Sequence, residues 1–146
     1  MLSKLPSFER LIGVFEKYSD IQAVYLFGSV ASGQMHRESD LDLGIVPRNK
    51  SLRQKRLAIL TDLARRGFCN VDLVFLDTDD IVLKYEVVRL NRVLYQTEDF
   101  DRGAMYSKVV RQYLDFRPYL EIQREAYKRR ILSGQTRSDT QATKQT

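Results

Sequence analysis

Apolar residues recur along most of the chain at spacings that predict alternating helices and strands. Leu11, Ile12 and Phe15 fall at helical spacing behind Ser7, which can cap the helix. Residues 21–27 instead form a short run of β-branched and aromatic side chains, which is typical of a buried strand. The same criteria predict helices over residues 5–18, 51–66, 79–91 and from about 100 to 132, and strands over residues 21–27, 39–46, 70–76 and 93–97.

Several of these elements end at residues that favour termination. Gly67 follows the helix over 51–66, where glycine can take the left-handed conformation that closes many helices. The strand over 39–46 is expected to stop before Pro47, and the short run over 93–97 to be an edge strand. Cys69, between a helix and a strand, is expected to be a buried small side chain.

The last predicted helix carries an apolar stripe made of Val109, Tyr113, Phe116, Leu120, Tyr127 and Ile131. Pro118 is expected to kink or split it, because proline lacks the helical donor and disfavours a helical Arg117. Residues 133–146 contain no large apolar side chain and are predicted to be a disordered tail.

The order of these elements predicts a small fold of the α/β (α+β) type. About four strands should form a mixed β-sheet flanked by helices, with a C-terminal helical extension beginning near residue 100. The chain has 146 residues, no internal repeat and no evident linker, so one domain over residues 1–132 is expected before the tail.

Composition narrows the class of protein without naming it. One cysteine rules out an intramolecular disulfide and fits a cytoplasmic location. No apolar run approaches the roughly 18 residues of a membrane span. Of the net charge of +5, residues 1–50 contribute nothing, since they hold six basic and six acidic side chains. The basic excess in residues 51–146 suggests an anionic partner or, alternatively, a solvated basic face.

Two aspartates carry the first sign of chemistry. Asp40 and Asp42 are two residues apart on a predicted strand and should share one face, while Leu41 and Leu43 point to the core. Adjacent carboxylates repel each other and are costly to desolvate unless a cation compensates them. Mg²⁺ suits that role because it prefers oxygen ligands and is often held by carboxylates together with substrate phosphates.

A third acid and a glycine can complete such a site. Asp72 lies between apolar residues of another strand, and it would approach Asp40 and Asp42 if that strand paired beside residues 39–46. Gly28 ends a buried strand and can let backbone approach a ligand. If Ser29 opens a helix, its N–H groups could bind phosphate. Each feature alone has a plainer explanation: a turn, a solvated acid pair, or an edge aspartate facing water.

The spacing of these residues resembles a known signature. Gly28-Ser29, ten residues and then Asp40-Leu41-Asp42 resemble the G-S-x10-D-x-D pattern of DNA polymerase β-like nucleotidyltransferases, with Asp72 as the third acid. The chain is most similar to the minimal nucleotidyltransferase (MNT) antitoxins of HEPN/MNT toxin–antitoxin systems. The similarity extends over residues 5 to about 132 and includes the sequence from Tyr113 to Tyr119.

The resemblance implies an activity and a role for each residue. Such antitoxins transfer AMP from ATP to a tyrosine of a HEPN-family RNase toxin and so neutralise it, and the two proteins associate as a hetero-oligomer. By position, Gly28 and Ser29 would bind the nucleotide, Asp40 and Asp42 would hold two Mg²⁺ ions, and Asp72 would bind the catalytic ion and help to deprotonate the acceptor. Neither membrane association nor stable DNA binding is expected.

Two other functions stay open on the sequence. The enzyme could act on RNA or a small molecule, or the antitoxin could neutralise its toxin by binding alone. The lack of a second domain favours a protein acceptor, which would bring its own recognition surface, and the basic second half could dock it. Alternatively, Tyr113, Phe116 and Tyr127 are ordinary core residues of a C-terminal helix.

Overall fold

The computed structural model describes residues 8–28 and 41–134 of the chain. In order along the chain, the elements are α1 (Phe8–Phe15), β1 (Ile21–Phe27), β2 (Leu41–Pro47), the 3₁₀ helix η2 (Lys50–Lys55), α3 (Arg56–Arg65), β3 (Val71–Phe75), α4 (Ile81–Val88), β4 (Val93–Gln96) and α5 (Arg102–Gly134). The chain divides into two units, residues 1–110 and 111–146.

Within the described part, four strands form one mixed sheet in the order β3-β2-β1-β4. β1 pairs antiparallel with both β2 and β4, whereas β2 and β3 run parallel. A parallel pair needs a crossover connection, and η2 and α3 supply it. This confirms the expected fold class, including the edge position of β4.

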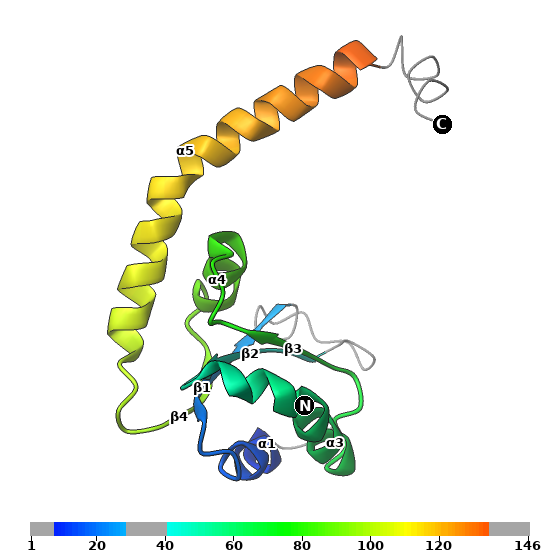
Figure 1. The fold of residues 1–146 in the computed structure, drawn as a ribbon, viewed down its shortest axis with the longest axis vertical. Coiled ribbons are helices and arrows are strands. Elements are labelled where there is room, and N and C mark those ends of the chain that lie inside the picture. The colour runs from blue at the N-terminus through cyan, green and yellow to red at the C-terminus, as the bar shows by residue number, and fades with distance from the viewer. Residues whose placement is uncertain (1–7, 29–40, 135–146) are drawn as a thin grey trace, which may run out of the picture. The chain divides into compact units, whose positions relative to one another are not determined.

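Helices cover both faces of the sheet (Figure 1), and each face has its own apolar core. Side chains of α1 and α3 pack on one face, where alternate residues of β1, β2 and β3, among them Leu26, Leu43 and Leu73, are buried. α4 packs on the other face through Val87 and Val88. The sheet therefore forms the middle layer of the first unit.

The helix expected over residues 51–66 begins as a different kind of helix. Its first turns form the 3₁₀ helix η2, and the α-helix starts only at Arg56. Asn49 caps η2, because its side chain accepts a hydrogen bond from the Ser51 N–H at 3.1 Å. The predicted closure at Gly67 is confirmed by its φ of 97°.

Three further expectations need correction. β2 includes Pro47 as its last residue instead of ending before it. Cys69 is exposed, because the neighbouring Phe68 fills the core at this point. α5 continues across Pro118 as one helix, so the expected split is wrong. α5 also includes residues 133 and 134, and the remainder of the predicted tail lies outside the described residues.

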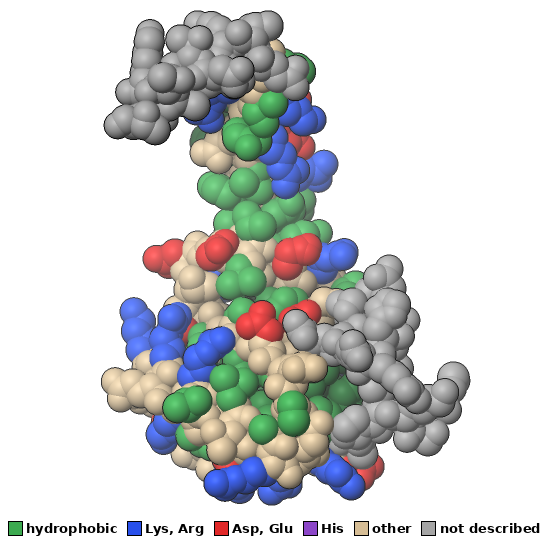
Figure 2. Space-filling view, turned by 90° about the vertical axis from the view of Figure 1, so that its right-hand side faces the viewer, with side chains coloured by type: hydrophobic (Ala, Val, Ile, Leu, Met, Phe, Trp, Pro, Cys, Tyr) green, Lys and Arg blue, Asp and Glu red, His purple; other side chains and the backbone are tan. Residues whose placement is uncertain are grey.

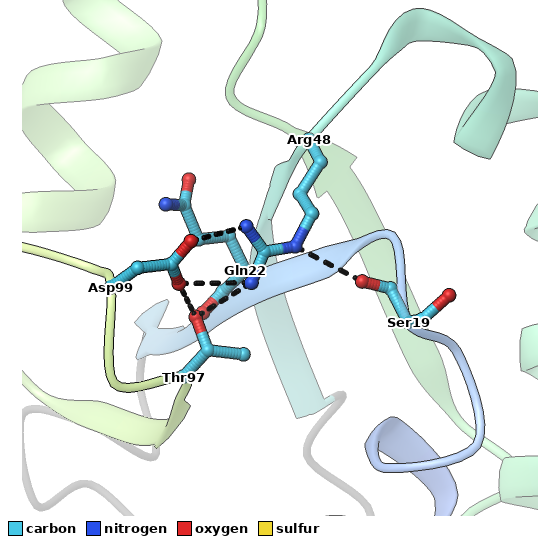
Figure 3. Close-up of polar contacts among 5 residues, drawn as sticks. All are labelled: Ser19, Gln22, Arg48, Thr97 and Asp99. Carbon is cyan, nitrogen blue, oxygen red and sulfur yellow. Dashed lines mark hydrogen bonds and ion pairs between the residues drawn. The ribbon is translucent and has the colours of Figure 1, made fainter.

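A polar network ties three strand ends together at the Ser19 end of the sheet (Figure 3). Two guanidinium nitrogens of Arg48 donate to the Asp99 carboxylate at 2.5 and 2.9 Å, and a third donates to the Ser19 carbonyl at 3.1 Å. The Thr97 hydroxyl donates to Asp99, and its backbone N–H donates to the Gln22 carbonyl at 2.9 Å. The hydrogen bonds from Arg48, and then those from Thr97, hold the pKa of Asp99 well below its usual range.

The lowered pKa of Asp99 predicts a pH dependence of stability. A carboxyl group with a depressed pKa stabilises the fold above its unfolded pKa of about 3.9, and this contribution is lost as the pH falls through the folded-state value. Wild type should therefore lose more stability than Asp99→Asn when melting temperatures are compared at pH 6 and pH 2. Asp79→Asn, at another exposed aspartate, should behave like wild type. Equal acid sensitivity of wild type and Asp99→Asn would contradict the assignment.

Gly44 predicts a second stability effect, because α4 approaches the sheet closely there. A Cβ at Gly44 would lie 2.5 Å from Cγ1 of Val87. Gly44→Ala should therefore destabilise the fold by about 1–3 kcal/mol in urea denaturation, the usual cost of overpacking a core. Gly103→Ala is the matched control, since its Cβ would meet its nearest atom at 3.7 Å. An unchanged midpoint for Gly44→Ala would show that α4 can move away without cost.

Candidate active site

The candidate site lies at the end of β1 and the beginning of β2, at the end of the sheet away from the Arg48 network. In the parallel ladder, Asp42 of β2 is directly opposite Asp72 of β3. On its other side Asp42 pairs with Phe27, the last residue of β1. Because opposite residues of a sheet project to the same face, the two carboxylates share one side. The predicted approach of Asp72 to Asp42 is thus confirmed.

The acids belong to the face that α4 covers. Alternation along β2 places Asp42 with Gly44 and Val46, and alternation along β3 places Asp72 with Val74. Val46 and Val74 pack against the core beneath α4. Along their strands, Asp42 and Asp72 lie nearer to the N-terminal ends than Val46 and Val74 do. Asp42 is therefore half-buried and Asp72 is exposed. The apolar rows behind them fix the backbone and leave the carboxylates accessible.

Gly28 leaves room for the Asp42 carboxylate. Its φ of 78° is in the left-handed region, and a Cβ built there would lie 2.0 Å from Oδ2 of Asp42. Any larger residue would therefore be strained and would also displace the carboxylate. The sequence predicted that Gly28 lets backbone approach a ligand, whereas the structure gives it an additional role beside an acid of the site.

Arg56 is a residue of this site that the sequence did not indicate. From the first position of α3, its guanidinium donates to the Leu73 carbonyl at 2.6 Å and lies 3.8 Å from Oδ1 of Asp72. This places a positive charge beside one acid of the pair. Arg56 belongs to no motif, and its position depends on where η2 ends and α3 begins, so no pattern in the sequence marks it.

The carboxylate oxygens of Asp42 and Asp72 are of the kind that bind divalent cations. Two carboxylates in register on one face are the kind of ligand that Mg²⁺ takes. Among residues 8–28 and 41–134, no group of three or more His, Cys, Asp or Glu could hold a metal ion. Asp40 and Ser29 lie outside the described residues, so the roles predicted for the Asp40 carboxylate and the Ser29 N–H groups stay predictions.

The space around Gly28 yields a prediction that does not depend on activity. Gly28→Ala should lower the free energy of unfolding by about 1–2 kcal/mol, because an L residue at positive φ is strained. It should also weaken Mg²⁺ binding in calorimetry, because the new methyl group displaces the Asp42 carboxylate. Gly103→Ala, the control, should lower neither the free energy of unfolding nor the affinity for Mg²⁺. Wild-type Mg²⁺ affinity in Gly28→Ala would argue against Asp42 as a ligand.

Comparisons with known proteins agree with this geometry. Residues 9–100 match the family described as polymerase beta, nucleotidyltransferase. The protein adenylyltransferase MntA of Shewanella oneidensis is 33% identical over 81 residues, which are 56% of this chain and 58% of that protein. The matched part therefore spans less than two thirds of this relative.

Solved structures extend the likeness beyond the catalytic unit. A chain in a crystal structure of a toxin–antitoxin with AMP-PNP is 26% identical, with a TM-score of 0.68 over 86% of this chain and 98% of that one. A chain in a structure of a tri-AMPylated Shewanella oneidensis HEPN toxin in complex with an MNT antitoxin is 23% identical. Its TM-score is 0.61 over 86% of this chain and 95% of that one, and this match shows a similar fold. The match over residues 9–100, together with the paired acids beside Gly28, shows that the chain belongs to the polymerase β nucleotidyltransferase family.

Proposed function

We propose that this nucleotidyltransferase is an antitoxin that moves AMP from ATP onto a tyrosine hydroxyl of a HEPN-type RNase toxin. The observation that carries the proposal is the in-register pair of Asp42 and Asp72 beside Gly28. It is supported by the similarity to protein adenylyltransferase MntA and to a chain of a toxin–antitoxin complex with AMP-PNP.

The proposed reaction exchanges one phosphorus–oxygen bond for another. The phenol oxygen of the acceptor attacks the α-phosphorus of ATP, the bond from that phosphorus to the bridging oxygen breaks, and pyrophosphate leaves. The phenol proton would pass to Asp72, in the role that the resemblance implies, and from there to water. A phenol has a pKa of about 10 and a carboxylate one of about 4, so a carboxylate base needs further charge stabilisation at the acceptor oxygen.

The residues divide this work between them. Asp40, Asp42 and Asp72 would hold Mg²⁺, with two ions as the resemblance implies. Bound there, Mg²⁺ would polarise the α-phosphate and lower the pKa of the attacking hydroxyl. Asp72 is the more exposed of the two acids that the structure describes, which suits a residue that an acceptor must reach. Gly28 and Ser29 would bind the triphosphate, and Arg56 adds a positive charge beside Asp72.

Modification of this kind would impair a ribonuclease for an electrostatic reason. Each added AMP brings a phosphodiester negative charge and considerable bulk. RNA is itself a polyanion, so a negative charge placed in its binding site repels the substrate. A covalent change also persists after the two proteins separate, which a binding-only antitoxin cannot achieve.

The proposal predicts the outcome of a transfer experiment. The full chain, its proposed HEPN-type RNase partner, ATP and Mg²⁺ should yield an RNase whose intact mass rises by whole AMP units. Asp42→Asn should slow this at least about a hundredfold, because a metal ligand supports several kcal/mol of transition-state stabilisation. Its melting temperature should not fall, since the change relieves repulsion with Asp72. Asp79→Asn should retain full activity.

Each alternative has its own signature in the same experiment. An unmodified RNase that Asp42→Asn still neutralises would indicate an antitoxin that acts by binding alone. An unmodified RNase together with an adenylylated RNA or small molecule would indicate the other enzymatic function. Full activity of Asp42→Asn would exclude this site as the centre of transfer.

A further inference from the structure

The second unit exposes far more apolar surface than a solvated helix needs. In residues 111–134 of α5, the exposed large hydrophobic side chains are Leu114, Phe116, Tyr119, Ile122, Tyr127, Ile131 and Leu132. Figure 2 shows hydrophobic side chains covering the middle of this helix. Tyr119 and Ile122 are 63% and 64% exposed. The sequence left open that Phe116 and Tyr127 are core residues of this helix. The structure rules this out, because both side chains are exposed.

Five of these side chains belong to one side of the helix. At 3.6 residues per turn, Phe116, Tyr119, Ile122, Tyr127 and Ile131 project over about half of the circumference, and Gln123 and Arg130 lie among them. We call the five large apolar side chains the α5 apolar face. A concentration of exposed large apolar side chains on one side of a helix is typical of an interaction site.

Basic residues border the α5 apolar face on both sides. By the same helical geometry, Arg124 and Lys128 follow one border and Arg129 the other. Glu121 and Glu125 project from the opposite side of the helix. Residues 111–134 hold six Lys or Arg and three Asp or Glu, so the segment is positive overall.

This charge pattern selects among possible occupants. Two copies of α5 packed face to face, in either direction, would bring basic borders together and repel each other. An anionic membrane surface would suit the borders, but Asp115 projects within the apolar arc and would be costly to place in hydrocarbon. A protein whose apolar surface is rimmed by acidic residues satisfies both the face and its borders.

The comparisons add a separate argument for a protein partner. The match to the toxin–antitoxin chain with AMP-PNP covers 86% of this chain, which is more than residues 1–110 contain. Part of the helical extension is therefore shared with a protein crystallised as a toxin–antitoxin. The catalytic family match, in contrast, ends at residue 100.

We infer that the α5 apolar face is the docking surface for the protein acceptor, which presents an apolar patch with an acidic rim. The inference rests on the proposed function, because it assigns the RNase as the occupant. Binding energy made on α5 would recruit the acceptor without involving the carboxylates of the site. Recognition and transfer would then be separable by substitution.

The test compares two aspartate substitutions on the same helix. Ile122→Asp places a charge in the α5 apolar face, whereas Leu114→Asp places one on the opposite side at a position that is 52% exposed. With the full chain and its proposed HEPN-type RNase partner, Ile122→Asp should raise the Kd at least about tenfold, because the charge would have to be desolvated. Leu114→Asp should leave the Kd unchanged. Circular dichroism should show equal helix content in both variants.

The borders allow an independent measurement. The double variant Arg124→Glu/Lys128→Glu should weaken binding of the RNase and reduce the salt dependence of the Kd, because opposite charges across an interface are screened by salt. If the charge reversal left the Kd unaffected, or if the wild-type Kd did not depend on salt, the RNase would not have the acidic rim that we infer.

Transfer kinetics separate this inference from the proposed function. Ile122→Asp should raise the KM for the RNase with little change in kcat, whereas Asp42→Asn should lose transfer and keep the wild-type Kd. A wild-type chain that neither binds nor modifies the RNase would overturn the proposed function and, with it, this occupant. If wild type modifies the RNase and Ile122→Asp does so with the same KM, the docking surface is wrong. An effect of Ile122→Asp confined to self-association, or to binding of phosphatidylserine vesicles, would also overturn it.

Discussion

The register of the parallel β2–β3 pair is the constraint on which the candidate site depends. Leu43 and Leu73 lie opposite each other and are both buried against the core under α1 and α3. Because side chains alternate along a strand, burying these leucines sets Asp42 and Asp72 on the other face and opposite each other. A slip by one residue would expose Leu73 and turn Asp72 into the core. The hydrophobic effect thus places a pair of charges that would not associate by themselves.

The crossover between these strands decides which face remains open. η2 and α3 return the chain on the face of the leucines, which leaves the face of the acids to α4 and the first turns of α5. α4 packs over Gly44, one step behind Asp42, where the absence of a side chain lets the helix approach closely. The carboxylates therefore lie where the packed layer ends, with Asp42 half-buried and Asp72 exposed. A site of this kind is held by rigid elements and needs no loop to form its acid pair.

The sequence predicted the elements wherever local pattern was decisive. β1 was predicted to the residue. Asp72 was expected near Asp42 on the condition that their strands pair, and the structure shows that they do. The 3₁₀ start of the third helical segment was missed, since its apolar spacing also fits an α-helix, and the Asn49 cap acts over only a few residues. Arg56 was missed for the same reason, because its reach to Asp72 depends on that helix boundary. Pro118 was expected to kink or split α5; it does not split the helix, because the loss of one donor does not interrupt it.

Arg56 also has a consequence for the behaviour of the protein at high concentration. β3 is an edge strand, and edge strands invite strands of other molecules to add to the sheet. The Leu73 carbonyl in the middle of β3 is occupied by the guanidinium of Arg56, and the exposed Asp72 side chain adds a charge at the preceding position. A blocked acceptor and a charge side by side discourage intermolecular β-pairing. The same arginine that accompanies an acid of the candidate site thereby protects the sheet from aggregation.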